Sequence, residues 1–289
     1  MIASDRLSGI ASMLFVPAGN ARLLASALNR PADGFILDQE DAIPPDQKKA
    51  ARQGLSADVT SLRSSGAQVG VRVNRPWTLL VPDLAACVAA GVDFVMVPKV
   101  DTPQFVVAVA EILRELGAPP QIYVISQIES ALALGRLADI AAAAPERQAA
   151  LMIGPEDLAV DLGADSSRTV MSVFAQMIVA AARGAGLVPI GSPGSIAEIG
   201  DMAAYREQME LGRRMGFGAA VAIHPRQVDV INAVFTPSPE AVASAREIVA
   251  RDAENGGRPF LHDGRMVDAP VVAKARRTIA LAEARKNAR

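Results

Sequence analysis

Short apolar runs alternate with longer segments of helical periodicity over the first 225 residues of the chain. Each run is rich in valine, isoleucine, leucine and phenylalanine and is apolar at successive positions, which is typical of a strand buried on both faces of a parallel sheet. This pattern predicts eight strands, at residues 12–18, 34–40, 68–74, 94–100, 122–129, 150–157, 186–193 and 219–225.

The segments between these strands are long enough for helices, and residues 103–117 and 129–144 are clear examples. Strands that alternate with helices form a parallel sheet covered by helices, and eight such units close into a barrel. We therefore expect the α/β class and a (β/α)8 TIM barrel. An open doubly wound sheet is the alternative, but the glycine pattern G-x-G-x-x-G is missing after the first strand.

The pattern changes beyond residue 226. The chain then predicts a turn and a helix over residues 231–255, with the helix beginning near Ser238, a polar glycine-rich segment over 256–268, and a second helix over 269–286. These elements follow the eighth strand and so lie outside the barrel. We expect a catalytic barrel domain over residues 1–230 and a helical extension, acting as a lid, over residues 231–289.

Polar side chains gather at the C-terminal ends of the predicted strands, and this end of a barrel carries the active site. These residues are Asp38, Glu40, Asp41, Arg72, Asn74, Lys99, Gln127, Glu129, Asp157, Ser192 and His224. A ring with both signs of charge predicts a bound cation and an anionic substrate. Carboxylate ligands without paired histidines or cysteines favour Mg²⁺ over Zn²⁺.

Three acids close together at the second strand need a partner, because neighbouring like charges repel one another. We therefore expect the bound Mg²⁺ to balance the charge of Asp38, Glu40 and Asp41, and the alternative is that Arg72 is a structural partner of Asp38 or Glu40. Alternation of side chains along a strand would place Glu40 on the face opposite Asp41.

Composition excludes several classes of partner. The chain has 29 basic and 31 acidic residues without a basic cluster, so we expect no binding to nucleic acid or to an anionic membrane. No apolar run approaches the roughly 18 to 20 residues that a membrane helix needs. The first 17 residues show neither a basic leader nor a cleavage site, which predicts a cytoplasmic protein. The single cysteine, Cys87, lies in an alanine-rich helical segment and is expected to be buried.

Several motifs spread over nearly the whole chain occur in a specific order. They are MLFVPAGNARLLASAL, FILDQEDAIPPDQKKAAR, GVRVN, VMVPKV, ISQIES, IGPEDLAVDLG, GFGAAVAIHPRQVDVINAVFTPS and DGRMVDAP. In this order they resemble the citrate lyase beta subunit family, with its malyl-CoA and citramalyl-CoA lyase relatives. The resemblance implies a Mg²⁺-dependent barrel that cleaves or forms a carbon–carbon bond between an acyl thioester and a 2-oxo acid.

The resemblance also implies roles for individual residues of the barrel. Arg72 would bind the carboxylate of the substrate. Glu129 and Asp157 would hold Mg²⁺, and Glu129 would also lie against the substrate. Such an ion acts as a Lewis acid and a template for a 2-oxo acid, whereas a guanidinium binds a carboxylate in a planar fork.

The remaining acids would support this arrangement. Glu40 and Asp41 would orient metal-bound water and Arg72 during catalysis, and Asp38 would lie at the substrate and fix a backbone amide. In the lyase relatives, an aspartate at the place of Asp268 comes from the lid of a neighbouring subunit and serves as general acid or base. This implies a homo-oligomer, either a trimer or a hexamer.

Two positions depart from the pattern of that family. Ala11 and Ala220 stand where relatives commonly have basic residues, which would naturally meet the phosphates of CoA. Lys48, Lys49 and Arg52 could bind those phosphates instead. Two alternatives therefore stay open: a lyase or aldolase for a free hydroxy acid without CoA, and a non-catalytic paralogue that binds a 2-oxo acid.

Overall fold

Parallel strands form the centre of the molecule in the computed structural model, which describes residues 6–287. The strands are β1 Ser12–Pro17, β2 Gly34–Asp38, β3 Gln68–Arg72, β4 Phe94–Val97, β5 Tyr123–Ile128, β6 Gln148–Ile153, β7 Val188–Ile190 and β8 Ala220–Ala222. They make one sheet of eight strands in the order β7-β6-β5-β4-β3-β2-β1-β8. All eight predicted strands are therefore present.

The sheet closes into a barrel where β7 meets β8. β1 pairs with β2 on one side and with β8 on the other, and a parallel bridge joins Ile190 to Ala219. Hydrogen bonds from Gly191 N to Ala219 O and from Gly218 N to Pro189 O, both 2.9 Å long, complete this junction. The predicted (β/α)8 barrel is confirmed, and the open doubly wound sheet is excluded.

Two apolar layers stabilise the barrel. Side chains such as Met13, Phe94 and Ile125 fill its interior, whereas those on the other face of each strand pack against the surrounding helices. Strands buried on both faces need apolar residues at successive positions, which explains the unbroken runs in the sequence. Cys87 is buried in the outer layer, as predicted.

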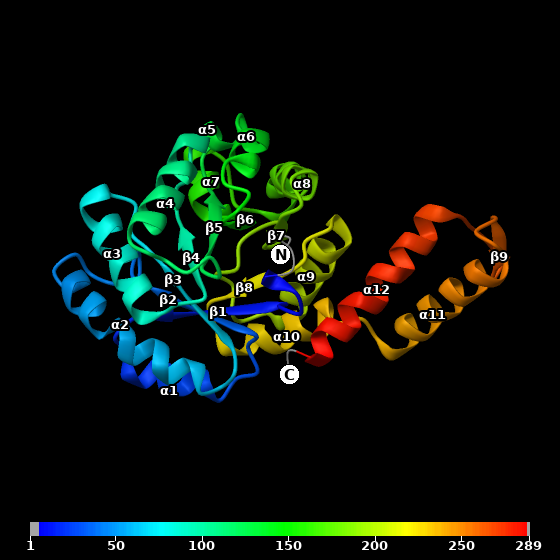
Figure 1. Cartoon of the computed structure of the whole chain (residues 1–289), viewed down its shortest axis with the longest axis horizontal. Helices are drawn as coiled ribbons and strands as arrows, with labels where there is room; N and C mark the ends of the chain where they lie inside the picture. Colours follow the sequence, from blue (N-terminus) through cyan, green and yellow to red (C-terminus); the bar gives the residue numbers. More distant parts are fainter. Residues whose placement is uncertain (1–5, 288–289) are drawn as a thin grey trace.

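Helices cover the outside of the barrel (Figure 1). They are α1 Ala21–Leu28, α2 Lys48–Arg63, α3 Trp77–Ala90, α4 Pro103–Glu115, α5 Ala131–Leu134, α6 Leu137–Ala142, α7 Pro155–Leu162, α8 Arg168–Gly184, α9 Met202–Met215 and α10 Pro225–Phe235. The single helix predicted over residues 129–144 is divided into α5 and α6, and the break falls at Gly135 and Arg136. Glycine is a poor helix former, which agrees with a break at this point.

Several strands end earlier than the apolar pattern predicts. β2 stops at Asp38 rather than at residue 40, and β6 stops at Ile153 rather than at residue 157. At β6 the reason is Pro155, which begins α7, because proline suits the first turn of a helix and cannot continue a central strand. The polar residues beyond these strand ends therefore lie in loops and in a helix start at the mouth of the barrel.

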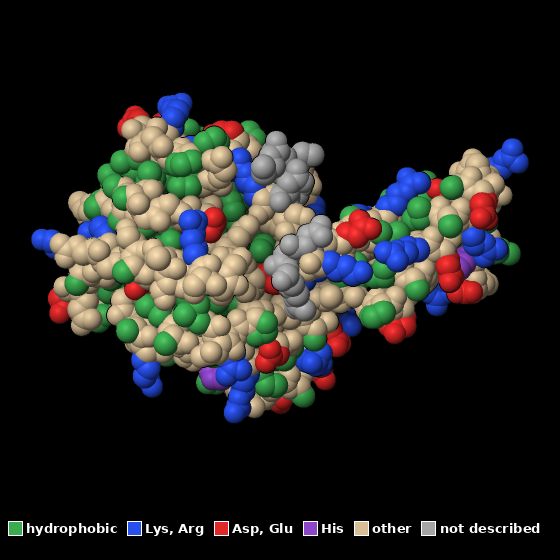
Figure 2. Space-filling view, turned by 60° about the horizontal axis from the view of Figure 1, so that its bottom comes forward, with side chains coloured by type: hydrophobic (Ala, Val, Ile, Leu, Met, Phe, Trp, Pro, Cys, Tyr) green, Lys and Arg blue, Asp and Glu red, His purple; other side chains and the backbone are tan. Residues whose placement is uncertain are grey.

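Residues beyond α10 form an arm that projects from the barrel (Figure 1). The arm consists of α11 (Pro239–Glu254), an antiparallel hairpin of β9 (Phe260–His262) and β10 (Arg265–Val267), and α12 (Ala269–Asn287). α11 and α12 pack against each other. The Ser238 hydroxyl caps α11, as predicted, by accepting from Ala241 N at 3.2 Å. Figure 2 shows basic and acidic side chains interspersed along the arm.

The last turns of α12 return to the barrel, where Arg285 is buried. Its Nη1 donates to Gly9 O at 2.7 Å and pairs with the Asp33 carboxylate, and its Nη2 donates to Asn232 Oδ1 at 3.1 Å. The arm is therefore anchored at its base by a buried charge whose three nitrogens all donate hydrogen bonds.

The predicted division into two domains stays a prediction. Its boundary between residues 230 and 231 falls inside α10, which contacts α9 and β1. Residues 1–5 and 288–289, the outer ends of the two predicted domains, lie outside the described residues. Among residues 6–287, no helix combines the length and the apolar character needed to cross a membrane.

Candidate active site

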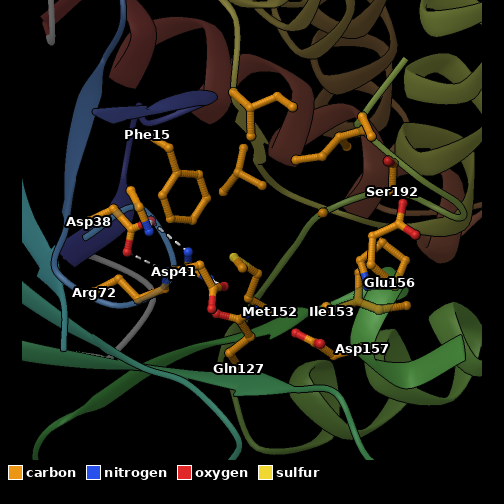
Figure 3. Close-up of a pocket in the computed structure, with 18 of the residues that line it drawn as sticks. Phe15, Asp38, Asp41, Arg72, Gln127, Met152, Ile153, Glu156, Asp157 and Ser192 are labelled. Carbon is orange, nitrogen blue, oxygen red and sulfur yellow. Dashed lines mark hydrogen bonds and ion pairs between the residues drawn. The ribbon is translucent and has the colours of Figure 1, made fainter. Parts of the chain in front are cut away.

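A cavity of about 360 Å³ opens at the C-terminal ends of the strands (Figure 3). Its polar lining includes Asp38, Asp41, Arg72, Gln127, Glu156, Asp157 and Ser192, and its apolar lining includes Phe15, Met152, Ile153, Ile196, Ala197, Val221 and Ile223. A concave space of this size with a few converging polar groups is typical of a small-molecule site. Its position agrees with the end of the barrel expected to carry the active site.

Arg72 is the last residue of β3. It contacts three acids, of which Asp38 ends β2 and Glu40 and Asp41 come just after it. Its Nε and Nη2 donate to Asp38 Oδ1 and Oδ2 at 2.9 and 2.7 Å, which is a bidentate pair. Its Nη1 lies 3.1 Å from both Glu40 Oε2 and Asp41 Oδ2. The guanidinium also lies over the Phe15 ring, 5.0 Å from the ring centre. The cation that pairs with these acids is therefore Arg72, rather than the bound metal ion expected from the sequence.

The chain turns at Asp38, and this turn brings Glu40 and Asp41 to the same cation. Asp38 Oδ1 accepts from Glu40 N at 2.9 Å, and Oδ2 accepts from Ala42 N at 3.2 Å. An aspartate that binds backbone amides just after itself typically fixes a turn. The predicted placement of Glu40 and Asp41 on opposite faces is wrong, because β2 ends at Asp38 and strand alternation does not extend beyond it.

Glu129 and Asp157 form a second group of carboxylates. Glu129 follows β5 and is only 3% exposed. Its Oε1 accepts from Lys99 N at 2.7 Å, and its Oε2 accepts from Gln127 Nε2. Asp157 lies in the first turn of α7, and its carboxylate points into the cavity (Figure 3).

Two backbone positions hold Glu129 in place. Lys99 has a φ of 51°, in the left-handed region that few residues other than glycine adopt, and in this conformation its N–H reaches the glutamate. Gly154 lies against the same side chain, since a β-carbon there would be 2.5 Å from Glu129 Oε2. A larger residue at position 154 would therefore displace the carboxylate.

The cavity region carries more negative than positive charge. Its carboxylates are Asp38, Glu40, Asp41, Glu129, Glu156 and Asp157, and the cations beside them are Arg72 and Lys99. Burial, and then the charge of Asp157, raises the pKa of Glu129 to about 8. Burial also raises the pKa of Glu40, although Arg72 acts in the opposite direction. Burial alone would lower the pKa of Lys99, but the nearby acids raise it.

Glu129 and Asp157 are better suited to a metal than the acids around Arg72, because those acids already have a cationic partner. Gln127 lies beside Glu129, and its buried Oε1 has no hydrogen-bond partner among the residues that the structure describes, so it could accept from metal-bound water. Among residues 6–287, no group of three or more His, Cys, Asp and Glu side chains is arranged to hold a metal. Two carboxylates nevertheless fit Mg²⁺, which takes one or two from a protein and completes its shell with water or substrate.

Lys48 and Arg52, which the sequence predicts as ligands of CoA phosphates, have partners inside the barrel wall. Lys48 Nζ donates to Gln39 O at 3.0 Å, to Glu40 O at 2.8 Å and to the side chain of Asn74. Arg52 pairs with the buried Asp83 at 2.7 Å. These contacts hold the loop after β2, and a role in binding CoA stays a prediction.

Ala11 and Ala220 lie away from the cavity. Ala11 precedes β1 at the opposite end of the barrel, where its N–H donates to Asp33 Oδ2 at 2.9 Å. Ala220 is the first residue of β8, and its side chain belongs to the outer apolar layer. The inference that these two alanines remove a phosphate site is wrong, because neither side chain faces the cavity.

Asp268 and His224 lie outside the cavity of their own chain. Asp268 is exposed at the distal end of the arm, where the hairpin leads into α12 (Figure 1). Delivery of this aspartate to a second subunit therefore stays a prediction. The Nδ1 of His224 accepts from Arg226 N at 3.2 Å and caps the start of α10.

Comparison with known proteins decides the family. The model of the family described as HpcH/HpaI aldolase/citrate lyase matches residues 11–225. The chain belongs to this family. It is 33% identical to citrate lyase subunit beta of Escherichia coli K12 over 286 residues, which cover 94% of this chain and 93% of the relative. It is also 33% identical to the (3S)-malyl-CoA thioesterase of Cereibacter sphaeroides ATCC 17023 over 281 residues, which cover 94% of each chain.

Solved structures of the HpcH/HpaI aldolase/citrate lyase type agree with this assignment. CitE from Mycobacterium tuberculosis in complex with magnesium, acetoacetate and coenzyme A superimposes with a TM-score of 0.76 at 30% identity, over 96% of this chain and 99% of that chain. The resemblance found in the sequence is confirmed, as is the assignment to a family of lyases. The predicted cofactor, Mg²⁺, is also supported for this family, because several structural neighbours are crystallised with magnesium.

Sequence reasoning missed the residues that act through packing and backbone bonds. Gly154 and the backbone of Lys99 hold Glu129, and Gln227 binds two loops at the mouth of the barrel. In the sequence these residues could be found only through the motifs that resemble the family. A glycine or an amide side chain carries no charge that would mark it as part of a site.

Proposed function

We propose that the protein is a Mg²⁺-dependent carbon–carbon lyase. Its substrate in the cleavage direction is a 3-hydroxyacyl-CoA such as malyl-CoA or citramalyl-CoA, and its products are an acyl-CoA and a 2-oxo acid. The observation that carries the proposal is that one cavity brings Arg72, oriented by a bidentate carboxylate, together with Asp157, whose charge acts on the buried Glu129. A 2-oxo acid needs a clamp for its carboxylate and a metal beside its carbonyl oxygen.

The names of related proteins support the same chemistry. The L-malyl-CoA/beta-methylmalyl-CoA lyase of Cereibacter sphaeroides ATCC 17025 is 31% identical over 300 residues, and these cover 93% of each chain. A structural neighbour from Mycobacterium tuberculosis is crystallised with magnesium and pyruvate, with a TM-score of 0.67 and 27% identity. Both point to a short 2-oxo acid beside a metal. With Ala11 and Ala220 placed away from the cavity, nothing in the site favours a substrate without CoA.

In this proposal Glu129 and Asp157 hold Mg²⁺, with the amides of Lys99 and Gln127 keeping Glu129 in place. The ion, when bound, supplies a Lewis acid for the oxygen next to the substrate carboxylate. Arg72 binds that carboxylate through Nη1, while Asp38 keeps the other two nitrogens fixed. Asp41 is the acid that would move away from Nη1, because its side chain is 62% exposed whereas that of Glu40 is 10% exposed.

Proton transfer requires a further group. Cleavage removes a proton from the hydroxyl and returns one to the α-carbon of the acyl fragment, so an acid or base must reach the reacting atoms. We place this role on Asp268 of a neighbouring subunit in a trimer or a hexamer, because the residue is exposed at the end of an arm that projects from its own barrel.

Mixing two inactive variants tests this assembly. Asp268→Asn should abolish turnover while leaving folding and Mg²⁺ binding intact. After dissociation and reassembly with Arg72→Ala, hybrid sites with an intact Arg72 and an intact Asp268 should restore part of the activity. Full activity of the Asp268→Asn protein would eliminate the shared site. An active protein that is a monomer by light scattering would eliminate it as well.

A screen of CoA thioesters tests the activity itself. Malyl-CoA and citramalyl-CoA are incubated with the protein and Mg²⁺, and released glyoxylate or pyruvate is measured separately from free CoA thiol. We expect the 2-oxo acid and an acyl-CoA to appear in equal amounts. Free thiol without a 2-oxo acid would show a thioesterase, and loss of neither bond would reject the lyase.

A further inference from the structure

A network of polar side chains connects α2 and α3 with the loops after β2 and β3. Asp83 of α3 is completely buried. Its Oδ1 accepts from Arg52 Nε at 2.7 Å, and its Oδ2 accepts from the backbone N and the Nδ2 of Asn74 at 3.0 and 2.7 Å. Asn74 Oδ1 in turn accepts from Lys48 Nζ. We call Arg52, Asp83, Asn74 and Lys48 the polar network.

Lys48 ends the polar network at the loop after β2. Its Nζ donates to Gln39 O at 3.0 Å and to Glu40 O at 2.8 Å, in addition to the side chain of Asn74. An ammonium group has three N–H donors, and these three acceptors occupy all of them. A phosphate could bind Lys48 only if one of these bonds broke.

The same bonds hold the loop against the backbone of Arg72. Gln39 N donates to Arg72 O at 3.0 Å, and Asn74 follows Arg72 by two residues. Lys48 binds the carbonyl of Gln39 on one side of this backbone bond and the side chain of Asn74 on the other. It therefore joins the loop after β2 to the segment that carries Arg72.

The bond from Lys48 to Glu40 O also bears on Asp41. This carbonyl belongs to the peptide that joins Glu40 to Asp41, so Lys48 fixes the backbone from which the Asp41 side chain extends. In the proposed function, Asp41 leaves Arg72 when the substrate carboxylate arrives, whereas the less exposed Glu40 stays. A fixed backbone allows one acid to move without displacing the other.

The start of α2 suits two roles for Lys48. A helix N-terminus favours acids, yet the first turn of α2 contains Lys48 and Lys49 rather than an acid. These cations serve either the loop or an anion, because a helix N-terminus also binds phosphate groups. The three hydrogen bonds of Lys48 favour the loop.

We propose that Lys48, Asn74 and Asp83 are positioning residues for the 2-oxo acid. Through them the polar network fixes the loop after β2, so that the acids of this loop meet the guanidinium that binds the substrate carboxylate. The polar network then acts on the 2-oxo acid half of the substrate and leaves the binding of CoA unchanged. This inference rests on the proposed function.

Calorimetry with two ligands separates this role from phosphate binding. Lys48→Met is titrated with pyruvate and, separately, with CoA, both in the presence of Mg²⁺. We expect the Kd of pyruvate to rise by roughly tenfold, as for the loss of about one hydrogen bond to a charged group, and the Kd of CoA to stay within about twofold. A rise in the Kd of CoA alone, larger at low salt, would overturn the inference in favour of a phosphate contact. Unchanged Kd values for both ligands would overturn it as well.

Arg147→Met is the matched control for a loss of stability. Arg147 is buried and donates to the carbonyls of Ala118, Pro119 and Ile122, so it also holds the backbone through its side chain. It directly precedes β6 and so lies at the end of the barrel opposite the cavity. This variant should lower the melting temperature and leave the Kd of pyruvate unchanged. An equal rise of this Kd in both variants would assign the polar network a role in stability only.

Hydrogen exchange measured by mass spectrometry tests the loop without any ligand. The amides of Gln39, Ala42 and Ile43 are hydrogen-bonded. In Lys48→Met, peptides that cover residues 39–43 should exchange faster by roughly tenfold, because local opening of the loop becomes easier. Peptides from β4 should exchange as in the unmodified protein. Faster exchange throughout the molecule would show a loss of global stability and would overturn the positioning role.

A swap of two side chains tests whether Asn74 and Asp83 act together. Asn74→Asp alone places two carboxylates side by side and should weaken the binding of pyruvate. Adding Asp83→Asn restores the total charge, and the new amide can donate to the new carboxylate, which can still accept from Lys48. The double variant should therefore recover part of the affinity for pyruvate. Additive losses would show that the two positions act independently and would overturn the inference.

The outcomes also separate this inference from the function on which it rests. If the unmodified protein binds neither pyruvate nor glyoxylate, the proposed function is rejected, and hydrogen exchange still decides whether Lys48 fixes the loop. If the unmodified protein cleaves CoA thioesters to a 2-oxo acid, but Lys48→Met binds pyruvate as tightly as the unmodified protein does, the function stands and the inference is rejected.

Discussion

The two groups of carboxylates in the cavity differ in how their charge is balanced. Three acids share Arg72, and its Nε, Nη1 and Nη2 all have carboxylate partners. Glu129 and Asp157 both act on the charge of Lys99, whose side chain is 45% exposed and whose Nζ pairs with Glu40 at 3.4 Å. The first group is therefore complete without a ligand, whereas the second has room for another cation.

This difference separates two tasks that look alike in the sequence. The acids after β2 position an arginine, which in turn is proposed to bind the substrate carboxylate. Glu129 and Asp157 are proposed to bind the metal. Changes at Glu129 or Asp157 should therefore reduce metal-dependent activity. Changes in the group around Arg72 should reduce stability and anion binding.

Removal of a carboxylate from the second group should have the largest effect. Asp157→Ala takes away one of two proposed Mg²⁺ ligands, and we expect kcat/KM to fall by at least about 1,000-fold, because a metal Lewis acid supplies several kcal/mol and each 1.36 kcal/mol is a factor of ten. Kinetics over a range of Mg²⁺ concentrations measure this. Asp229→Ala removes an exposed carboxylate of α10 and serves as the control. Normal activity of Asp157→Ala after exhaustive chelation would contradict the assignment.

Disruption of the first group should instead destabilise the fold. Asp38→Asn breaks a buried bidentate pair, and removing one partner of a buried pair typically costs about 3 to 5 kcal/mol. We expect the lower end of that range, about 3 kcal/mol, because Glu40 and Asp41 still face Arg72. Urea unfolding gives the free energy of unfolding. If Asp157→Ala destabilises the protein as much as Asp38→Asn does, the two groups of carboxylates do not have different tasks.

A change of cation within the first group should have a smaller effect. Arg72→Lys keeps the charge but loses the planar fork, so we expect pyruvate to bind more weakly by about 1 to 3 kcal/mol, the range of a hydrogen bond to a charged group. Calorimetry in the presence of Mg²⁺ measures the change. Arg114→Lys, at an exposed position of α4, is the matched control. Unchanged affinity would leave Arg72 as a structural partner of Asp38.

The pH dependence of Mg²⁺ binding should show the smallest effect per step, at most tenfold for each pH unit. The pKa of Glu129 is raised from 4.5 to about 8, chiefly by burial, so the folded protein keeps a proton on this carboxyl over a range in which the unfolded chain has lost it. The metal-free protein therefore loses stability as the pH rises from about 5 to about 8. Because Mg²⁺ must displace this proton, its affinity should rise by up to tenfold per pH unit below about pH 8. Titration calorimetry at several pH values measures this, and a constant affinity from about pH 6 to about pH 8 would contradict it.

The architecture could be predicted because it depends on patterns that a single sequence contains. Eight apolar runs separated by helical segments define the barrel, and the capping position of Ser238 marks the start of α11. Several members of the polar ring could also be predicted, since strand ends converge in a barrel, but His224 lies outside the cavity. The prediction was least accurate at the ends of strands. Glu40 and Asp41 were expected on opposite faces of β2, but β2 ends at Asp38 and both residues contact Arg72.

The remaining features depend on spatial relations that no local pattern records. The bidentate contact of Asp38 with Arg72 joins residues 34 positions apart. The role of Ala11 was misjudged because its distance from the cavity depends on which end of β1 faces the mouth. Gly154 matters through its closeness to Glu129 rather than through a special backbone angle, so its importance is visible only in three dimensions.

The buried Arg285 at the base of the arm has a consequence for amide hydrogen exchange. Amides in the last turns of α12 lie next to this anchor and should exchange slowly, because their opening requires a buried charge to leave Asp33 and Asn232. The hairpin at the other end exposes Leu261 and Met266, so amides around it should exchange fast in an isolated subunit. Slow exchange at the hairpin as well, lost on dilution, would therefore show directly that another subunit covers the end of the arm.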